Sequence, residues 1–164
     1  MTELSAAFPI LTELIAHAAE VSAYLWEKGW AERNAGNLSL DVTDIMVAGE
    51  QAEADAFHVK LDHAYPDLAG RCFLVTGTGS RFRDCAKNLS PNTCLLRMSD
   101  AGDGYHFLAG GDGRKDYRPT SEFPSHLRIH EYLHQQNAPQ SVVLHTHPTE
   151  LIALRPKPAS RSDR

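Results

Sequence analysis

The spacing of apolar residues near the N-terminus predicts a long amphipathic helix followed by a strand. Pro9 suits the first turn of a helix, and the helical pattern ends near Gly29. Between them, apolar residues recur at helical spacing at Ile10, Leu14, Val21 and Leu25. Residues 38–42 then alternate between apolar and polar side chains, which is typical of a strand.

Three further strands are predicted in the middle of the chain. The run CFLVT at residues 72–76 is apolar almost throughout and predicts a buried strand that ends in a glycine-rich turn. Two more strands are expected on either side of the turn DAGDG at residues 100–104, where they form a hairpin. Residues 45–70 are mixed and acidic, and they predict a surface excursion.

The last predicted elements are a helix and a buried strand. The helix is expected to start from an N-cap at Thr120 or Ser121 and to continue through Leu133. The apolar run SVVLHTHP, which follows, predicts the strand.

The composition indicates one soluble domain. A length of 164 residues suits a single domain over residues 1–154, while residues 155–164 are basic and nearly free of apolar groups, as in a disordered tail. The net charge of -5 offers no general attraction for nucleic acid or an anionic membrane. No spanning segment or signal peptide is evident, so a cytoplasmic protein is expected. The three cysteines lack metal or disulfide spacing and are expected to be reduced thiols in or near the core.

The motif His145-Thr146-His147 is a candidate metal site. Alternate residues of a strand share a face, so both imidazoles can point at one ion. Two neutral imidazoles suit zinc or another borderline divalent metal, and a catalytic zinc usually has three protein ligands and one open position. No histidine follows His147 in this sequence, so the third ligand is an open question.

Two glycine-containing clusters offer neutral donors to a phosphate or a sugar hydroxyl. The first, Arg33-Asn34-Ala35-Gly36-Asn37, precedes a predicted strand and has an alternative interpretation as a helix C-cap and turn. The second, Thr76-Gly77-Thr78-Gly79-Ser80, follows a predicted strand and lacks the lysine of a Walker loop. For each cluster alone, a plain turn is the simpler interpretation.

The helix before the histidine pair carries two competing candidates for acid and base chemistry. Glu122, in its first turn, is either a capping residue or a general acid/base beside a metal. His130-Glu131-Tyr132-Leu133-His134 satisfies HExxH, the zinc motif of metalloproteases. The extended protease motif fails at Asn137 and Gln140, and Glu150 is only a distant third ligand. His126, His130 and His134 are therefore expected to be mostly surface or packing residues.

The order of these clusters resembles the class II aldolase/adducin family. The resemblance rests on WAERNAGNLSL, FLVTGTGS, PTSEFPSH and VVLHTHPTELIAL, and covers roughly residues 20–154. It implies an α/β/α sandwich around a mostly antiparallel sheet and a homotetramer. It also implies that His145 and His147 bind zinc and that Glu122 is the catalytic acid/base. The residues that it places around the phosphorylated end of a ketose substrate are Asn34, Gly36, Asn37, Thr78, Gly79 and Ser121.

Within the family, the similarity is greatest to members that cleave L-rhamnulose 1-phosphate, in rhamnose catabolism, into dihydroxyacetone phosphate and L-lactaldehyde. The resemblance implies zinc as the Lewis acid and no Schiff-base lysine. Sugar-phosphate 4-epimerases and dehydratases share the histidine pair and the phosphate clusters, and adducin-like members are non-catalytic modules, so both remain alternatives.

The sequence departs from the family pattern after LIAL at residues 151–154. Family members continue beyond this segment with the third zinc histidine, more sheet and part of the subunit contact surface. The expectation is a C-terminally truncated member, with weaker zinc binding, impaired activity and a less secure tetramer.

Overall fold

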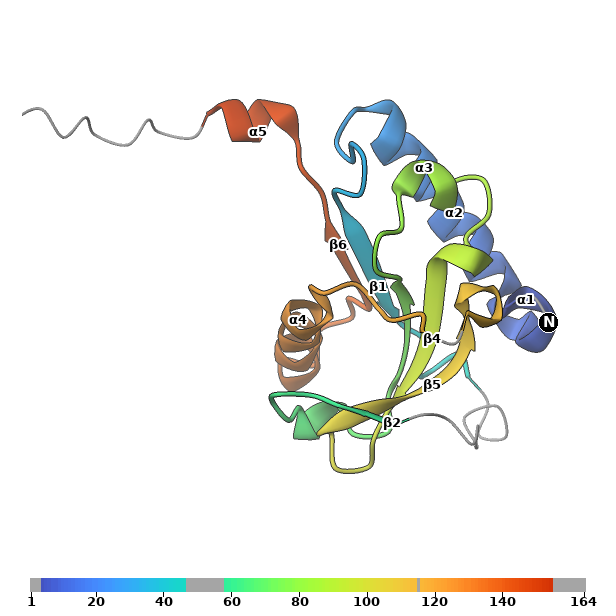
Figure 1. Cartoon of the computed structure of the whole chain (residues 1–164). Helices are drawn as coiled ribbons and strands as arrows, with labels where there is room; N and C mark the ends of the chain where they lie inside the picture. Colours follow the sequence, from blue (N-terminus) through green and yellow to red (C-terminus); the bar gives the residue numbers. More distant parts are fainter. Residues whose placement is uncertain (1–3, 47–57, 115, 155–164) are drawn as a thin grey trace, which may run out of the picture.

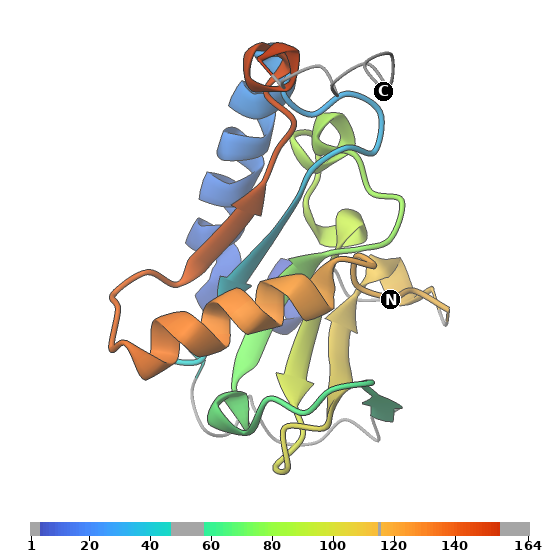
Figure 2. The same cartoon turned by 90° about the vertical axis from the view of Figure 1, so that its left-hand side faces the viewer.

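A computed structural model describes residues 4–46, 58–114 and 116–154, which form a six-stranded sheet with helices on both faces (Figures 1 and 2). The strands lie in the order β2-β5-β4-β3-β1-β6, and every neighbouring pair is antiparallel. Their bounds are β1 Asn37–Asp41, β2 His58–Lys60, β3 Cys72–Thr76, β4 Thr93–Met98, β5 Gly104–Gly110 and β6 Val142–His145. The predicted α/β/α arrangement around an antiparallel sheet is confirmed.

The helices divide between the two faces of the sheet. One face carries α1, α2 and α3, the other carries α4, and α5 lies beyond the end of β6, away from the sheet (Figure 1). The bounds are α1 Leu4–Ala7, α2 Thr12–Glu27, α3 Phe82–Cys85, α4 Phe123–Gln135 and α5 Thr149–Ala153. Short 3-10 helices cover Pro9–Leu11, Pro66–Leu68, Ser90–Asn92 and Gly111–Gly113.

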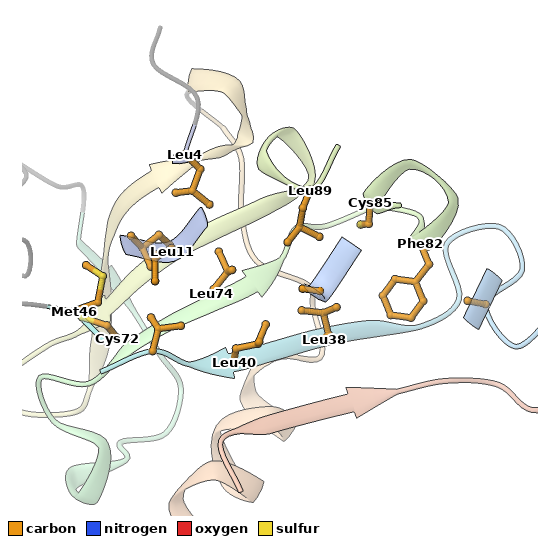
Figure 3. Close-up of a cluster of buried hydrophobic side chains, with 14 residues drawn as sticks. Leu4, Leu11, Leu38, Leu40, Met46, Cys72, Leu74, Phe82, Cys85 and Leu89 are labelled. Atoms are coloured by element: carbon orange, nitrogen blue, oxygen red, sulfur yellow. The ribbon is translucent and has the colours of Figure 1, made fainter. Parts of the chain in front are cut away.

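Each face of the sheet has its own apolar core, and β3 contributes to both. On the α2 side, Leu74 of β3 meets Leu38 and Leu40 of β1 (Figure 3). On the α4 side, Phe73 packs in a second cluster with Phe123 of the helix. A strand covered on both faces needs apolar side chains at nearly every position, which explains the run CFLVT.

The N-terminal helix was predicted correctly, and part of its apolar face packs as expected: Leu14 and Leu25 lie against the core, whereas Ile10 and Val21 are exposed. It opens as a 3-10 turn at Pro9 and becomes α2 at Thr12. Ala18 and Ser22 are the buried residues of α2, while Val21 is 42% exposed. Small side chains let the helix approach the sheet closely, and the Ser22 hydroxyl donates to the Ala18 carbonyl at 2.8 Å, so its burial leaves no unpaired donor.

The strands of the middle region are confirmed, but part of the predicted surface excursion is structured. Thr93–Met98 and Gly104–Gly110 form the expected hairpin. Residues 58–60 form the edge strand β2, and Tyr65 and Leu68 are buried against the sheet. The prediction of a surface excursion was therefore wrong for this part, and residues 47–57 lie outside the described residues, as does the predicted tail at 155–164.

The last helix and strand differ from the prediction in detail. The α4 helix starts at Phe123, with Glu122 at the N-cap position and no side-chain cap, so neither Thr120 nor Ser121 is the N-cap. The β6 strand pairs with β1 at one edge of the sheet, and Val142 is 49% exposed. The prediction of a buried strand was wrong because β6 is an edge strand within the part of the chain that the structure describes.

All three cysteines are buried and unpaired, as predicted. Burial raises the pKa of Cys72 to about 11 and that of Cys85 to about 12, so these thiols are protonated at neutral pH. None of the helices in the described ranges is long and apolar enough to cross a membrane.

Candidate active site

The two histidines of the HTH motif lie side by side at the end of the edge strand. His145 is the last residue of β6 and pairs with Asn37 of β1. His147 lies beyond the strand, where its backbone N–H donates to the Trp30 carbonyl at 2.8 Å. The two ring Nε2 atoms are 3.1 Å apart. The imidazoles therefore converge as predicted, although only His145 belongs to the strand.

The spacing of these two nitrogens fits a shared metal ion. Two imidazole nitrogens bound to one tetrahedral zinc lie about 3.3 Å apart, given Zn–N bonds of about 2.0–2.1 Å. The observed Nε2–Nε2 distance of 3.1 Å is close to this value. No third His, Cys, Asp or Glu completes a metal-binding group within the described ranges. The chain thus offers two converging ligands.

Glu122 lies against the other nitrogen of His145. Its Oε2 is 2.5 Å from His145 Nδ1, and both side chains are partly exposed. The angles are not those of a hydrogen bond, so Nδ1 has no hydrogen-bond partner, and the contact becomes an ion pair only when the imidazole is protonated. A carboxylate is therefore held next to the histidine pair without occupying the gap between the two Nε2 atoms.

Glu150 does not act as the third ligand in this arrangement. Its Oε2 accepts a hydrogen bond from Trp30 Nε1 at 3.1 Å and a longer one from its neighbour Thr149. Since the Trp30 carbonyl also binds the His147 backbone, this tryptophan links the loop after α2 to the segment that carries the histidine pair. The role of Trp30 was not foreseen, because its contacts depend on strand order.

Gly36 joins three of the sequence clusters. Its backbone has a positive φ of 92°, and a Cβ at this position would lie 3.0 Å from the His145 carbonyl oxygen and 3.1 Å from the Phe82 ring. Phe82 opens α3, directly after the turn at residues 76–80. The glycine therefore lets the first cluster pack against both the histidine strand and the element that follows the second cluster.

Replacing Gly36 with alanine is expected to lower the free energy of unfolding by about 2–3 kcal/mol, because backbone strain adds to overpacking. Gly29→Ala is the matched control: it has a similar φ of 73° but no atom within 4 Å of the position that a Cβ would take, and should cost about 1 kcal/mol. Urea unfolding measures both. Equal losses of unfolding free energy in the two variants would show that the contacts with His145 and Phe82 do not add to the cost of the Gly36 replacement.

The residues expected around a phosphate occupy the same end of the sheet. Asn37 is 5% exposed, and its side-chain oxygen is buried without a hydrogen-bond partner. An unpaired buried acceptor costs free energy unless a ligand or water satisfies it. Gly79 has a φ of 74° and open space around it, and Asn34 and Ser121 are exposed. These groups are available to a polar ligand.

Thr78 instead connects the second cluster to the segment before Glu122. Its hydroxyl donates to the Pro119 carbonyl at 2.7 Å, and its N–H donates to the Arg118 carbonyl at 2.8 Å. Thr120 N–H in turn donates to the Thr76 carbonyl at 2.8 Å. The second cluster is thus a scaffold for the carboxylate as well as a candidate phosphate loop.

The first cluster is not a helix C-cap. The helix α2 ends at Glu27, and Gly29 has the positive φ of 73° typical of a glycine just past a helix end. Trp30 N–H donates back to the Leu25 carbonyl at 3.0 Å, which satisfies one of the last carbonyls. Residues 33–37 therefore form a separate connection into β1.

The HExxH residues do not converge. His130 is 3% exposed and its Nε2 lies 2.8 Å from Ser39 Oγ, whereas His134 is exposed. His126, also buried, bonds to the same hydroxyl at 2.7 Å. The expectation of packing residues is confirmed for His126 and His130, and that of a surface residue for His134. Ser39 was missed, because the alternation in β1 suggested that its face was exposed.

Burial lowers the pKa of His126 and that of His130 to about 4, because desolvation penalises the charged imidazole. In the unfolded chain, both imidazoles take up a proton near the ordinary pKa of about 6.5. Burying them as neutral rings therefore costs no free energy above that pH. Below it, the unfolded chain binds protons that the folded chain does not, so the fold loses stability as the pH falls toward 4. Lowering the pH from about 7 to about 5 should reduce the free energy of unfolding by up to about 2 kcal/mol for each histidine.

Urea unfolding at the two pH values measures this effect. His130→Phe should reduce the loss, because one buried imidazole is gone. His134→Phe, which replaces an exposed imidazole, should lose as much stability as the parent chain. A loss that is unchanged in His130→Phe would mean that other groups cause the pH dependence.

The chain is similar to a known protein family and to individual known proteins. A family model described as Class II Aldolase and Adducin N-terminal domain matches residues 16–158. A rhamnulose-1-phosphate aldolase from Bacteroides thetaiotaomicron is 37% identical over 147 residues, which cover 89% of this chain and 53% of that protein. Another from Listeria welshimeri is 37% identical over 139 residues, covering 82% and 48%.

A solved structure extends the comparison to three dimensions. The crystal structure of a sugar-phosphate aldolase from Thermotoga maritima superposes with a TM-score of 0.71 at 33% identity, covering 87% of this chain and 56% of that one. The chain therefore spans about half the length of the relatives that it matches.

Proposed function

Because this chain belongs to the class II aldolase and adducin family, we propose that it carries the reaction centre of a zinc-dependent aldolase. The proposed reaction is reversible cleavage of L-rhamnulose 1-phosphate into dihydroxyacetone phosphate and L-lactaldehyde. Two relatives named rhamnulose-1-phosphate aldolase support this choice of substrate. The observation that carries the proposal is the contact of Glu122 with His145, whose second nitrogen lies 3.1 Å from that of His147.

His145 and His147 are the residues that hold the zinc ion. When bound, zinc supplies a Lewis acid for the negative charge that develops on the substrate oxygens. The backbone of this chain keeps both rings in place: His145 is paired to Asn37 in the sheet, and His147 is tied to the Trp30 carbonyl. The two Nε2 atoms, 3.1 Å apart, are thus held in position before any ligand arrives.

Glu122 exchanges the proton at the substrate carbon that becomes nucleophilic. In the direction of synthesis, its carboxylate takes a proton from the hydroxymethyl carbon of dihydroxyacetone phosphate. In the direction of cleavage, the carboxylic acid returns that proton to the same carbon. A proton transfer of this kind needs a carboxylate within hydrogen-bond reach of the carbon beside the carbonyl, and the contact of Glu122 with His145 supports this role.

Neutral groups bind the phosphate end of the substrate. These groups are the amides, hydroxyls and backbone N–H groups of Asn34, Gly36, Asn37, Thr78, Gly79 and Ser121. Thr78 takes part by exchanging the hydrogen bond from its hydroxyl to the Pro119 carbonyl for one to the phosphate. Such a site needs no strong cationic charge, in keeping with the net charge of -5.

The proposal includes the homotetramer that the family resemblance implies. Sedimentation velocity of the chain measures its oligomeric state.

Deuterium exchange into dihydroxyacetone phosphate tests the proposal. This partial reaction needs no aldehyde, and proton NMR in D₂O follows it directly. We expect exchange that depends on added zinc and stops with a chelator. A folded, zinc-loaded chain that exchanges no deuterium contradicts the proposal. Assays with several ketose phosphates then separate an aldolase from a 4-epimerase or a dehydratase.

A further inference from the structure

One buried hydroxyl connects the central sheet to two histidines of α4. Ser39 of β1 is fully buried, and its Oγ lies 2.7 Å from His126 Nδ1 and 2.8 Å from His130 Nε2. His126 and His130 are 2% and 3% exposed. This group, the Ser39–His126–His130 cluster, lies between the sheet and α4 and takes no part in the proposed reaction.

The cluster has a direction, because Ser39 has a single hydroxyl proton. The hydroxyl can donate to one ring and must accept from the other for both contacts to be hydrogen bonds. In one arrangement Ser39 donates to His126 Nδ1 and His130 Nε2–H donates to Ser39, so both rings carry their proton on Nε2. In the reverse arrangement both rings carry it on Nδ1.

The surroundings of His126 select the first arrangement. His126 follows Glu122 by one helical turn, and its backbone N–H donates to the Glu122 carbonyl at 3.1 Å. Its Nε2 is buried and has no hydrogen-bond partner, and the charge of Glu122 acts on the ring. In the field of this negative charge, a proton on the ring nitrogen that does not contact Ser39 is more favourable than a lone pair.

We propose that His126 is a positioning residue for Glu122. The hydrogen-bond chain from His130 through Ser39 fixes the His126 ring with its proton on Nε2, and the ring fixes the first turn of α4. This turn holds the Glu122 carboxylate 2.5 Å from His145. The positioning itself rests on the cluster, while its effect on turnover rests on the proposed role of Glu122.

Imidazole nitrogen NMR of the histidine-labelled chain tests the direction of the cluster without any activity. At about pH 7 the buried rings are neutral, so their two-bond proton–nitrogen patterns report the tautomer. We expect the Nε2–H form for both His126 and His130, and loss of this fixed form in Ser39→Ala. A proton on Nδ1 of His126 overturns the proposal.

Variants of His126 then test positioning. His126→Phe keeps an aromatic ring but removes both nitrogens, while His126→Gln restores an N–H near the position of Nε2. We expect the carboxyl ¹³C resonance of Glu122, assigned by its absence in Glu122→Gln, to shift in His126→Phe and to return toward the parent value in His126→Gln. His134→Phe, on the exposed side of the same helix, is the control and should leave it unchanged.

The exchange assay adds a second readout of the same variants. In His126→Phe we expect kcat for deuterium exchange to fall about 10-fold or more, with little change in KM and partial rescue in His126→Gln. A Glu122 resonance that does not move in His126→Phe overturns the proposal whatever the activity. Absence of exchange in the parent chain, with the expected tautomers and resonance shifts, would contradict the proposed function alone.

Discussion

Replacing Glu122 by glutamine should slow zinc-dependent deuterium exchange into dihydroxyacetone phosphate by about 10²–10⁴-fold, the range lost with a general acid/base. Glutamine has nearly the same shape but cannot take up a proton, so the contact region beside His145 keeps its packing. We expect the loss mainly in kcat, since Glu122 acts on the reacting carbon rather than on the phosphate. Initial rates from proton NMR at saturating substrate measure it.

The matched control for this variant is Glu131→Gln, which makes the same change in the HExxH segment of α4. Glu131 is partly buried one turn before the end of the helix and belongs to no metal-binding group in the described part of the chain. We expect exchange within about 2-fold of the parent, because catalytic losses of a general base are far larger. Loss of exchange in Glu131→Gln with retention in Glu122→Gln would transfer the chemistry to HExxH.

Removing the paired imidazoles should abolish stoichiometric zinc binding. His145→Ala or His147→Ala alone should weaken zinc binding by more than about 100-fold, since loss of an outer partner of a ligand already costs about 10–100-fold. The double variant should bind no zinc that calorimetric titration can detect. The physical reason is that the two Nε2 atoms, 3.1 Å apart, form a chelating pair, whereas one imidazole is a monodentate ligand.

His134→Gln is the control for zinc binding, because it removes an exposed imidazole of the HExxH segment without touching the buried cluster. Its affinity for zinc should equal that of the parent chain. If zinc binding were unchanged in the double variant at His145 and His147 but lost in His134→Gln, the zinc site would lie in the HExxH segment and not at His145 and His147. Circular dichroism of each variant separates loss of a ligand from loss of the fold.

Local patterns predicted the secondary structure well where one signal was strong, such as an apolar run or a glycine-containing turn. The run at 72–76 and the hairpin around residues 100–104 followed from apolar runs and turn residues. The apolar spacing of α2 predicted the packing of Leu14 and Leu25 against the core. It did not predict the burial of Ser22, which is tolerated because its hydroxyl donates to the Ala18 carbonyl of the same helix. The exposure of β6 could not be predicted, since an apolar strand has the same sequence pattern at the edge of a sheet as in its centre.

The candidate site was predictable in its residue types but not in its connections. His145, His147 and Glu122 carry recognisable chemistry in the sequence, and the structure brings them together. The packing of Gly36 against the His145 carbonyl depends on β1 pairing with β6, which no local pattern encodes. The same holds for Ser39, whose partners lie on a helix far along the chain.

The edge position of β6 links occupancy of the site to local unfolding. This four-residue strand is held in the sheet by β1 alone among the described strands, and two of its apolar side chains, Val142 and Leu144, are exposed. Fraying of such a strand costs less than global unfolding and would carry His145 away from Glu122. A ligand that needs both residues binds only the docked strand, so it slows amide hydrogen exchange along β6 by mass action.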